Sequence, residues 1–315
     1  MRFHKYQALG NDYLVLEAPG AALTPALVRA VCDRRLGVGA DGVLFEEVPP
    51  DGGPPPGGVP APADADAWAR SPAPEGAPAS QAAFTLRILN PDGSEAEKSG
   101  NGLRIFARYL WDQGRVGAEP FDVTTRGGVV RCQVRDGGRA VFVEMGVASF
   151  DALAIPVAGP PREVVDEPIE VGSERLRFTA VTVGNPHCVV LVDAPTPELA
   201  RRLGPALETH PAFPRRTNVQ FVRVVDRGRL ELQVWERGAG YTLASGSSAC
   251  AAAVASVRLG LCDGNVTAAM PGGELEITVA AGYELTMLGP VRKVAEGTLA
   301  EELLAEAGRR AGTER

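Results

Sequence analysis

The start of the chain alternates apolar and polar residues with a period of two, which predicts β-strands. Residues 2–17 follow this pattern on both sides of Gly10-Asn-Asp12, so we expect two strands joined by a tight turn. A helix is expected from about Pro25 to Arg35. A tight loop at 37–42 then leads into a strand at 43–46.

Two short stretches have the same pattern, a Gly-rich turn that enters an apolar helix through a serine. The first covers residues 90–104 and contains Ser99, and the second covers 236–250 and contains Ser245. Serine is a preferred N-cap residue, so we expect each helix to begin at its serine. The serines lie almost half the chain apart, which predicts two similar lobes.

The second of these helices, expected over 249–259, is small or apolar on nearly every side and carries one charge, Arg258. A helix that is apolar all round must be surrounded by other parts of the protein.

In the first helix Arg104 and Arg108 share one face. Asp136-Gly-Gly138 is a hairpin signal between two strand-like runs. Strand-like runs are expected at 84–89, 129–134, 140–145, 178–183, 188–193, 219–225, 230–235 and 274–279.

These elements predict an α/β (α+β) fold with two similar lobes. Each lobe is expected to be a mostly antiparallel, β-barrel-like sheet wrapped around a central helix, with the active site in the cleft between the lobes. The N-terminal lobe is predicted to comprise residues 1–147 and 288–315, and the C-terminal lobe 148–287. Residues 49–81 are rich in Pro, Gly and Ala and cannot form a core, so we interpret them as a disordered surface insertion.

Composition excludes several classes of protein. The net charge of −7 leaves no basic excess for a general nucleic-acid binder. No run of 18 apolar residues is present, so no membrane span is expected. The 5 cysteines form no CxxC pair and there are 3 histidines, so no zinc site and no metal are expected. Dispersed cysteines fit a reducing compartment, which favours a cytoplasmic protein.

The two serine turns suggest a specific chemistry. First-turn N–H groups of a helix have no intrahelical partner and attract anions such as carboxylates. Two such turns facing one cleft would place Ser99 and Ser245 on opposite sides of one substrate atom. That geometry suits removal of a proton from one face and its return to the other. The alternative is that both serines act as N-caps and nothing more.

The sequence resembles the diaminopimelate epimerase family from end to end, apart from residues 49–81. The resemblance rests on a set of short motifs: Ala8-Leu-Gly-Asn-Asp12, Gly37-Val-Gly-Ala-Asp-Gly42, Asn90-Pro-Asp-Gly-Ser-Glu95, Gly100-Asn-Gly102, Gly184-Asn-Pro-His187, Thr217-Asn218 and Glu236-Arg-Gly-Ala-Gly240. It implies an isomerase of lysine and peptidoglycan-precursor biosynthesis that inverts an amino-acid α-carbon without pyridoxal phosphate or metal. It also implies a homodimer.

Family members use two cysteines as the acid–base pair, and both matching positions hold serine here, Ser99 and Ser245. A serine hydroxyl is a much weaker acid than a thiol and needs a strong local base. The resemblance supplies one helper for each serine, His187 for Ser99 and Glu236 for Ser245. Cys188 and Cys250 are expected to be buried packing residues.

Three further positions depart from the family pattern: Lys98, Tyr241 and Ser248. They favour a naturally divergent protein over an engineered double substitution. The resemblance also implies a set of substrate contacts, in which amides both donate and accept and an arginine holds a carboxylate. These contacts map to Asn11, Asn90, Gly100, Asn101, Asn185, Asn218, Glu236, Arg237, Gly246 and Ser247. For each asparagine taken alone, turn chemistry is the alternative.

Three functions therefore remain open. The first is an epimerase interconverting LL- and meso-diaminopimelate by two-base α-proton transfer, impaired by serine at both acid–base positions. The second is a divergent isomerase or dehydratase acting on another amino acid. The third is a non-catalytic protein that binds the ligand.

Overall fold

The computed structural model describes residues 1–17, 23–47 and 83–313. The chain divides into two compact units, one built from the described residues up to Val143 together with those from Pro290, and one spanning Glu144–Gly289. The sequence predicted these divisions at 147/148 and 287/288. The expected disordered insertion at 49–81 lies outside the described residues.

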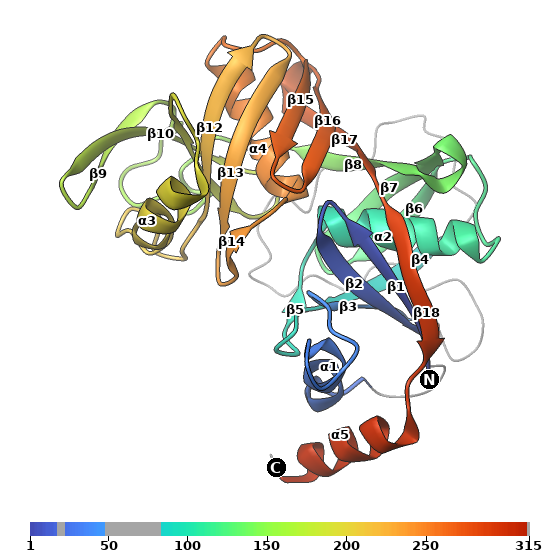
Figure 1. The fold of residues 1–315 in the computed structure, drawn as a ribbon. Helices are drawn as coiled ribbons and strands as arrows, with labels where there is room; N and C mark the ends of the chain where they lie inside the picture. The colour runs from blue at the N-terminus through green and yellow to red at the C-terminus, as the bar shows by residue number, and fades with distance from the viewer. Residues whose placement is uncertain (18–22, 48–82, 314–315) are drawn as a thin grey trace. The chain divides into compact units, whose positions relative to one another are not determined.

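The first unit is a mixed sheet around the helix α2 (Figure 1). Its strands pair antiparallel except β2 with β3 and β4 with β6. Helix α2 packs against β1, β2 and β7, and α1 packs against α5. The elements are β1 (Arg2–Ala8), β2 (Asn11–Glu17), α1 (Pro25–Cys32), β3 (Val43–Glu46), β4 (Ala83–Leu89), β5 (Glu95–Ala96), α2 (Gly100–Asp112), β6 (Phe121–Thr125), β7 (Gly128–Arg135), the 3-10 turn η2 (Asp136–Gly138), β8 (Ala140–Val147, which crosses the boundary), β18 (Arg292–Thr298) and α5 (Glu301–Thr313).

The second unit repeats this plan around the helix α4 (Figure 1). Its parallel pairs are β11 with β12 and β13 with β15, and its other pairs are antiparallel. Helix α3 covers β12, β13 and β14. The elements are β9 (Glu167–Val171), β10 (Glu174–Thr182), β11 (Pro186–Leu191), α3 (Pro197–Glu208), β12 (Asn218–Asp226), β13 (Arg229–Glu236), β14 (Gly240–Thr242), α4 (Gly246–Arg258), β15 (Asn265–Met270), β16 (Gly273–Val279), the 3-10 turn η3 (Ala281–Tyr283) and β17 (Glu284–Pro290).

Helix α4 is enclosed as its composition predicts. Strands β10 to β13, β15 and β16 all contact it, and its residues from Ser248 to Ser256 are buried. Alanines fill most of these positions, so the strands can approach closely. Each buried methyl group adds to the hydrophobic stabilisation, at roughly 25 cal/mol for every Å² of apolar surface removed from water.

The predicted class is confirmed: an α/β chain in two units, each with a mostly antiparallel sheet around a central helix. The predicted strands and the hairpin around Asp136-Gly-Gly138 are present. One helix end was predicted wrongly, because α1 ends at Cys32 and not near Arg35. The Asp33 carboxylate accepts the N–H groups of Arg35 and Leu36 at 2.7 and 2.8 Å, which turns the chain out of the helix.

The sequence analysis identified no element over 197–208, where α3 lies. The start signal is nevertheless present, because Thr196 caps the helix by accepting the Leu199 N–H at 3.1 Å and Pro197 follows it. Helix α3 matters for the site because it ends in Glu208, described below.

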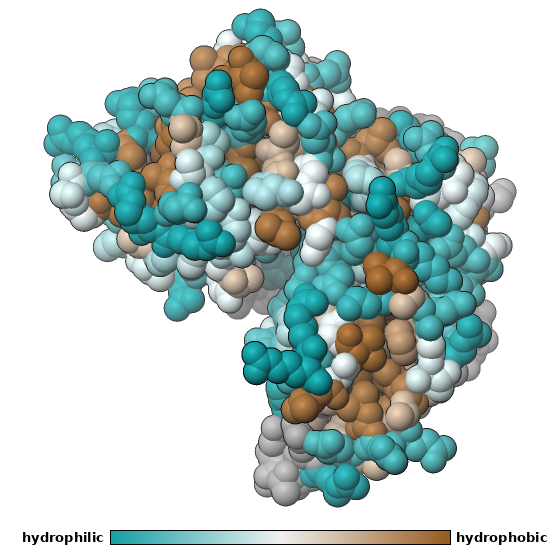
Figure 2. Space-filling model, viewed as in Figure 1, coloured by the Kyte–Doolittle hydropathy of each residue, from teal (hydrophilic) through white to brown (hydrophobic). Residues whose placement is uncertain are grey.

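Polar residues cover most of the visible surface, and apolar residues show between them on both units (Figure 2). Larger apolar side chains that remain exposed include Leu36, Val129, Leu153 and Val294. None of the helices in the described ranges has both the length and the apolar character needed to span a membrane.

Candidate functional site

Ser99 stands where the sequence places it, as the N-cap of α2. Its φ and ψ of −138° and 117° are extended, and its Oγ accepts the Gly102 N–H at 3.0 Å. This bond satisfies one of the first-turn donors. Gly100 and Asn101, both predicted to contact substrate, form the buried first turn directly after it. The cap role is therefore real, and it leaves the Ser99 hydroxyl hydrogen available for another partner.

The phenol oxygen of Tyr13 lies 3.3 Å from Ser99 Oγ, and either hydroxyl can be the donor of this hydrogen bond. Tyr13 reaches this position because residue 42 is glycine. A Cβ at Gly42 would lie 2.6 Å from Tyr13 Cε1 and 2.6 Å from the Leu89 carbonyl oxygen, too close for either atom. The sequence analysis did not identify Tyr13, since nothing in its own surroundings along the chain links it to Ser99.

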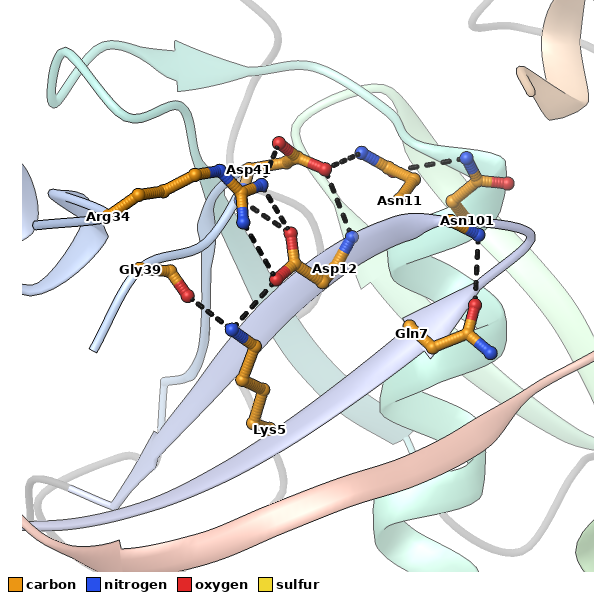
Figure 3. Close-up of polar contacts among 9 residues, drawn as sticks. Lys5, Gln7, Asn11, Asp12, Arg34, Gly39, Asp41 and Asn101 are labelled. Atoms are coloured by element: carbon orange, nitrogen blue, oxygen red, sulfur yellow. Dashed lines mark hydrogen bonds and ion pairs between the residues drawn. The ribbon is translucent and has the colours of Figure 1, made fainter. Parts of the chain in front are cut away.

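Asn11 and Asn101 meet beside this serine turn (Figure 3). Asn101 Nδ2 donates to Asn11 Oδ1 at 3.0 Å, and Asn11 Nδ2 donates to Asp41 Oδ2 at 3.0 Å. Arg104 is fully buried, and its Nη2 donates to Asn101 Oδ1 at 2.8 Å. Two residues predicted as substrate contacts are thus joined to each other and to a charged group at either end.

Asp12 lies in the same network, next to Asn11 on β2. Arg34 Nη2 contacts Asp12 Oδ1 at 2.7 Å and Asp41 Oδ1 at 2.5 Å, and Lys5 Nζ lies 2.9 Å from Asp12 Oδ2. Burial opposes ionisation of Asp12, but the hydrogen bonds from Arg34 and Lys5 outweigh it and lower its pKa to about 2. Asp12 is therefore a charged structural anchor at neutral pH.

Asn90, the other predicted contact in this unit, lies in the turn before β5. Its Nδ2 donates to Ser94 Oγ at 2.9 Å, and its backbone N–H donates to the Ser94 carbonyl at 2.8 Å. Asp92 accepts both the N–H and the hydroxyl of Ser94. Asn90 thus performs turn chemistry here, and no bond between it and Asn11 or Asn101 is found in the described residues.

Ser245 begins α4 in the same conformation as Ser99 begins α2, with φ and ψ of −144° and 124°, but its environment differs. Its side chain makes no cap hydrogen bond, and its backbone N–H lies 3.5 Å from Met270 Sδ. The side chain is 3% exposed. Gly246, a predicted contact, is buried in the first turn, and the neighbouring Ser247 is partly exposed.

His187 is fully buried in β11, and both ring nitrogens are engaged. Gln220 Nε2 lies 3.0 Å from Nδ1, and Nε2 lies 2.8 Å from Asn185 Oδ1. Gln220 Nε2 also donates to Ser248 Oγ in α4 at 3.0 Å. Since the glutamine nitrogen only donates, Nδ1 is the acceptor and the Nε2–H donates to Asn185. His187 therefore fixes the amide of Asn185, a predicted substrate contact.

Burial lowers the pKa of His187 to about 3, and the positive charge of Arg237 acts in the same direction. The ring is neutral at physiological pH. It belongs to the second unit and Ser99 to the first, so the predicted Ser99–His187 pair stays a prediction.

Asn218, Glu236 and Arg237 gather at the ends of β12 and β13. Asn218 Oδ1 accepts the Arg237 backbone N–H at 3.0 Å, and Asn218 Nδ2 donates to the Pro186 carbonyl at 2.9 Å. Asn218 also lies beside His187 in the parallel register of β11 and β12. The second unit thus brings Asn218 and Arg237 together with His187, where β12 begins and β13 ends. The Ser245–Glu236 pair stays a prediction.

The turn that carries Arg237 is braced by Glu208 at the end of α3. Glu208 Oε1 accepts the Gly238 N–H at 3.1 Å, and Oε2 accepts the Trp235 Nε1–H at 2.7 Å. Glu208 is buried, and Arg216 lies 3.4 Å from it as a counter-charge. Arg237 itself is exposed, and its Nη1 donates to the Arg215 carbonyl at 3.4 Å.

Two of the three further departures from the family pattern, Tyr241 and Ser248, have structural partners. Tyr241 donates to Gln233 Oε1 at 2.7 Å, and the Arg201 guanidinium lies 4.1 Å from the centre of its ring. Ser248 accepts from Gln220 as described. Cys188 and Cys250 are both fully buried, which confirms them as packing residues, and all 5 cysteines are free thiols. Within the described ranges no group of three His, Cys, Asp or Glu side chains could hold a metal.

Comparison with known proteins decides the family. The sequence model described as diaminopimelate epimerase matches residues 3–150 and 179–294. The chain belongs to the diaminopimelate epimerase family. Within it, diaminopimelate epimerase 2 from Nostoc sp. (strain PCC 7120) is 46% identical over 307 residues, covering 97% of this chain and 98% of that protein. The diaminopimelate epimerase from Moorella thermoacetica is 40% identical over 306 residues, covering 94% and 98%.

Solved structures with lower identity share the fold of this family member. A hydroxyproline epimerase from Agrobacterium vitis, crystallised with bound trans-4-hydroxy-L-proline, aligns with a TM-score of 0.62 at 17% identity. The alignment covers 94% of this chain and 91% of that one. The likeness confirms the architecture and carries no statement about substrate.

Proposed function

We propose that the protein is a diaminopimelate epimerase, an isomerase that interconverts the LL and meso forms by proton transfer at one α-carbon. The proposal rests on family membership: the chain is 46% identical to a diaminopimelate epimerase over nearly its whole length. The two serine turns support it, because each presents first-turn N–H groups and a hydroxyl at the start of a buried helix.

The proposed reaction needs one base and one acid. One of the two serines first gives its hydroxyl proton to its helper, His187 for Ser99 or Glu236 for Ser245, and the resulting alkoxide takes the α-proton. The electron pair stays on the substrate carbon and its carboxylate, and the hydroxyl of the other serine gives its proton to the opposite face. The backbone N–H groups of Gly100, Asn101, Gly246 and Ser247 would hold substrate carboxylates, with partial positive charge from the helix N-termini. No cofactor takes part in this scheme.

Serine at both acid–base positions makes the step difficult, and the surroundings of the two hydroxyls are unequal. Tyr13 lies against Ser99, whereas the hydroxyl of Ser245 makes no cap bond. Glu236 is the proposed helper of Ser245, and His187 of Ser99. The second role is weakly supported, because a ring with a pKa near 3 is a poor base.

This weakness favours one alternative, a non-catalytic member of the family that binds a diamino diacid. A binding protein needs Asn185, Asn218 and Arg237 held in place, and the hydrogen bonds of the second unit hold them. It needs no strong base. A divergent isomerase or dehydratase acting on another amino acid has no comparable support from the contacts described above.

Three further properties are proposed on the family resemblance. The protein would act in lysine biosynthesis, as a homodimer, in the cytoplasm. Five free and buried thiols are compatible with a reducing compartment.

Exchange of the substrate α-hydrogen in D₂O, followed by proton NMR, tests the proposal with LL- and meso-diaminopimelate. We expect slow loss of the α-proton signal with the wild type and loss at least about tenfold faster with Ser99→Cys/Ser245→Cys, a barrier change of about 1.4 kcal/mol or more. Ser99→Ala/Ser245→Ala should be inactive. Ser173→Cys, at an exposed hairpin serine, controls for an added thiol.

Exchange by the double cysteine variant but not by the wild type would instead support the binding protein. Absence of exchange in both would contradict the diaminopimelate assignment.

A further inference from the structure

A chain of amides with a charged group at each end runs through the first unit, and Figure 3 shows its part from Asn101 through Asn11 to Asp41. Starting at the buried Arg104, the guanidinium donates to Asn101 Oδ1 at 2.8 Å. Asn101 Nδ2 then donates to Asn11 Oδ1, and Asn11 Nδ2 donates to Asp41 Oδ2, both at 3.0 Å. In all three hydrogen bonds the donor therefore lies on the Arg104 side and the acceptor on the Asp41 side.

The charged ends determine how each amide is turned. An asparagine side chain can rotate by half a turn and exchange its oxygen and nitrogen, and its partners decide which orientation is stable. Arg104 can only donate, so it needs the Asn101 oxygen. Both Asp41 carboxylate oxygens accept hydrogen bonds, so Asp41 needs the Asn11 nitrogen. Rotating Asn11 alone would set oxygen against the carboxylate and nitrogen against the Asn101 nitrogen.

Asp41 is itself held firmly. Its Oδ2 also accepts the Asp12 backbone N–H at 3.1 Å, and its backbone N–H donates to the Asp12 carbonyl at 2.8 Å. Arg34 binds Oδ1 at 2.5 Å. Asn11 follows a two-residue turn in which Leu9 and Gly10 both have positive φ, 57° and 85°, which fixes the start of β2.

With its oxygen occupied by Asn101 and one amide hydrogen occupied by Asp41, Asn11 keeps one N–H for a ligand. We propose that Asp41 and Arg104 are positioning residues that lock Asn11 as a hydrogen-bond donor, so that it receives a carboxylate of the substrate and not an ammonium group. The choice of diaminopimelate as ligand rests on the proposed function; the locking of Asn11 does not.

The first test uses the wild-type protein without ligand. Hydrogen exchange of side-chain amides, followed by NMR, should show two hydrogens protected from water at least about tenfold more than those of Asn90: the Asn11 hydrogen donated to Asp41 and the Asn101 hydrogen donated to Asn11. The second Asn11 hydrogen, which is left for the ligand, should exchange faster than the first. Asn90 is the internal control, since its amide donates to a serine in an exposed turn. Equal exchange at the three asparagines would overturn the locking.

The second test exchanges the two side chains in Asn11→Asp/Asp41→Asn. Net charge and side-chain size are kept, and the amide now at position 41 can donate to the carboxylate at position 11. The N–H that faced the ligand is replaced by an acceptor. Binding of LL-diaminopimelate by calorimetry should weaken about 10- to 100-fold, the range expected for one charge-assisted hydrogen bond.

Pimelate, which carries both carboxylates and no ammonium group, is the probe for the carboxylate itself. As a competitor against the wild type it should displace diaminopimelate, and in the exchanged variant it should lose affinity by the same factor. Glu46→Gln is the matched control. It is also a carboxylate-to-amide change that removes an ion pair, with Arg115, and among the described residues no hydrogen bond or ion pair joins Glu46 to Asn11.

Unchanged affinity in the exchanged variant, or an equal loss in Glu46→Gln, would overturn the assignment of Asn11 as a carboxylate donor. If the wild type binds no diaminopimelate, the proposed function fails and the carboxylate assignment with it. The amide-exchange experiment would still decide whether Asp41 holds Asn11, so the two failures can be told apart.

Discussion

Lowering the pH from about 7.5 to about 5.0 should cost the folded protein about 2 kcal/mol through His187 alone. The ring is fully buried, and its pKa is lowered to about 3 in the folded state from 6.5. As the pH falls through 6.5 the unfolded chain takes up a proton at this residue and the folded chain does not. Stability therefore falls with pH, by about 1.36 kcal/mol per unit once the pH is well below 6.5 and until it nears 3.

The assay is urea unfolding of the wild type and His187→Asn at several pH values. The variant should be less stable at every pH, because Gln220 and Asn185 lose a partner. It should, however, lose about 2 kcal/mol less than the wild type between the two pH values, since it cannot take up this proton. The comparison cancels the contributions of all other titrating groups that the two proteins share.

A second readout needs no variant. The Cε1–H resonance of His187 should stay at its neutral position down to about pH 4. A titration of that signal near pH 6.5, or equal pH dependence of stability in the two proteins, would refute the reasoning. It would mean that the ring is more solvated or better paired when charged than its hydrogen bonds indicate.

Two further pairs of substitutions separate local effects. Ser99→Ala should lower the free energy of unfolding by about 1 kcal/mol, because Ser99 accepts a first-turn N–H. Ser245 makes no such bond, so Ser245→Ala should not have this capping cost. Urea unfolding of both variants measures the difference. Gly204→Ala should destabilise by about 1–3 kcal/mol, since the new Cβ would lie 2.5 Å from Trp235 Cγ. Gly228→Ala, whose Cβ would meet nothing closer than 3.7 Å, is its control in the same assay, and equal effects of the two changes would contradict the packing argument.

The alternation of apolar and polar residues was enough to locate most strands, and the serine turns located the starts of α2 and α4. These signals are local, so sequence alone carries them. The end of α1 depended on a side-chain bond from Asp33 that competes with the helix, and the helical pattern did not reveal it. Helix α3 also has a local start signal, the N-cap Thr196 followed by Pro197, although no helix was predicted there.

The sequence could predict which residues belong to the candidate site, but not which hydrogen bonds join them. Asn11 and Asn101 could be identified from motifs, but the buried Arg104 that orients Asn101 looked like one of two arginines on a helix face. Gln220 is a polar residue inside an apolar strand, a signal that could have marked it as the partner of a buried group. Pairings across the fold depend on which strands become neighbours, and these strands lie far apart along the chain, so no local pattern sets their register.

The absent side chain at Gly42 has a consequence for comparing members of this family. The Tyr13 ring occupies the space that a side chain at position 42 would fill, and this places its hydroxyl 3.3 Å from Ser99 Oγ. A relative with a larger residue there must move the tyrosine, and its acid–base group would then have a different neighbour. The identity of residue 99, serine or cysteine, therefore does not by itself predict its reactivity. The residue at position 42 decides whether Tyr13 can lie against residue 99, so the three positions must be compared together.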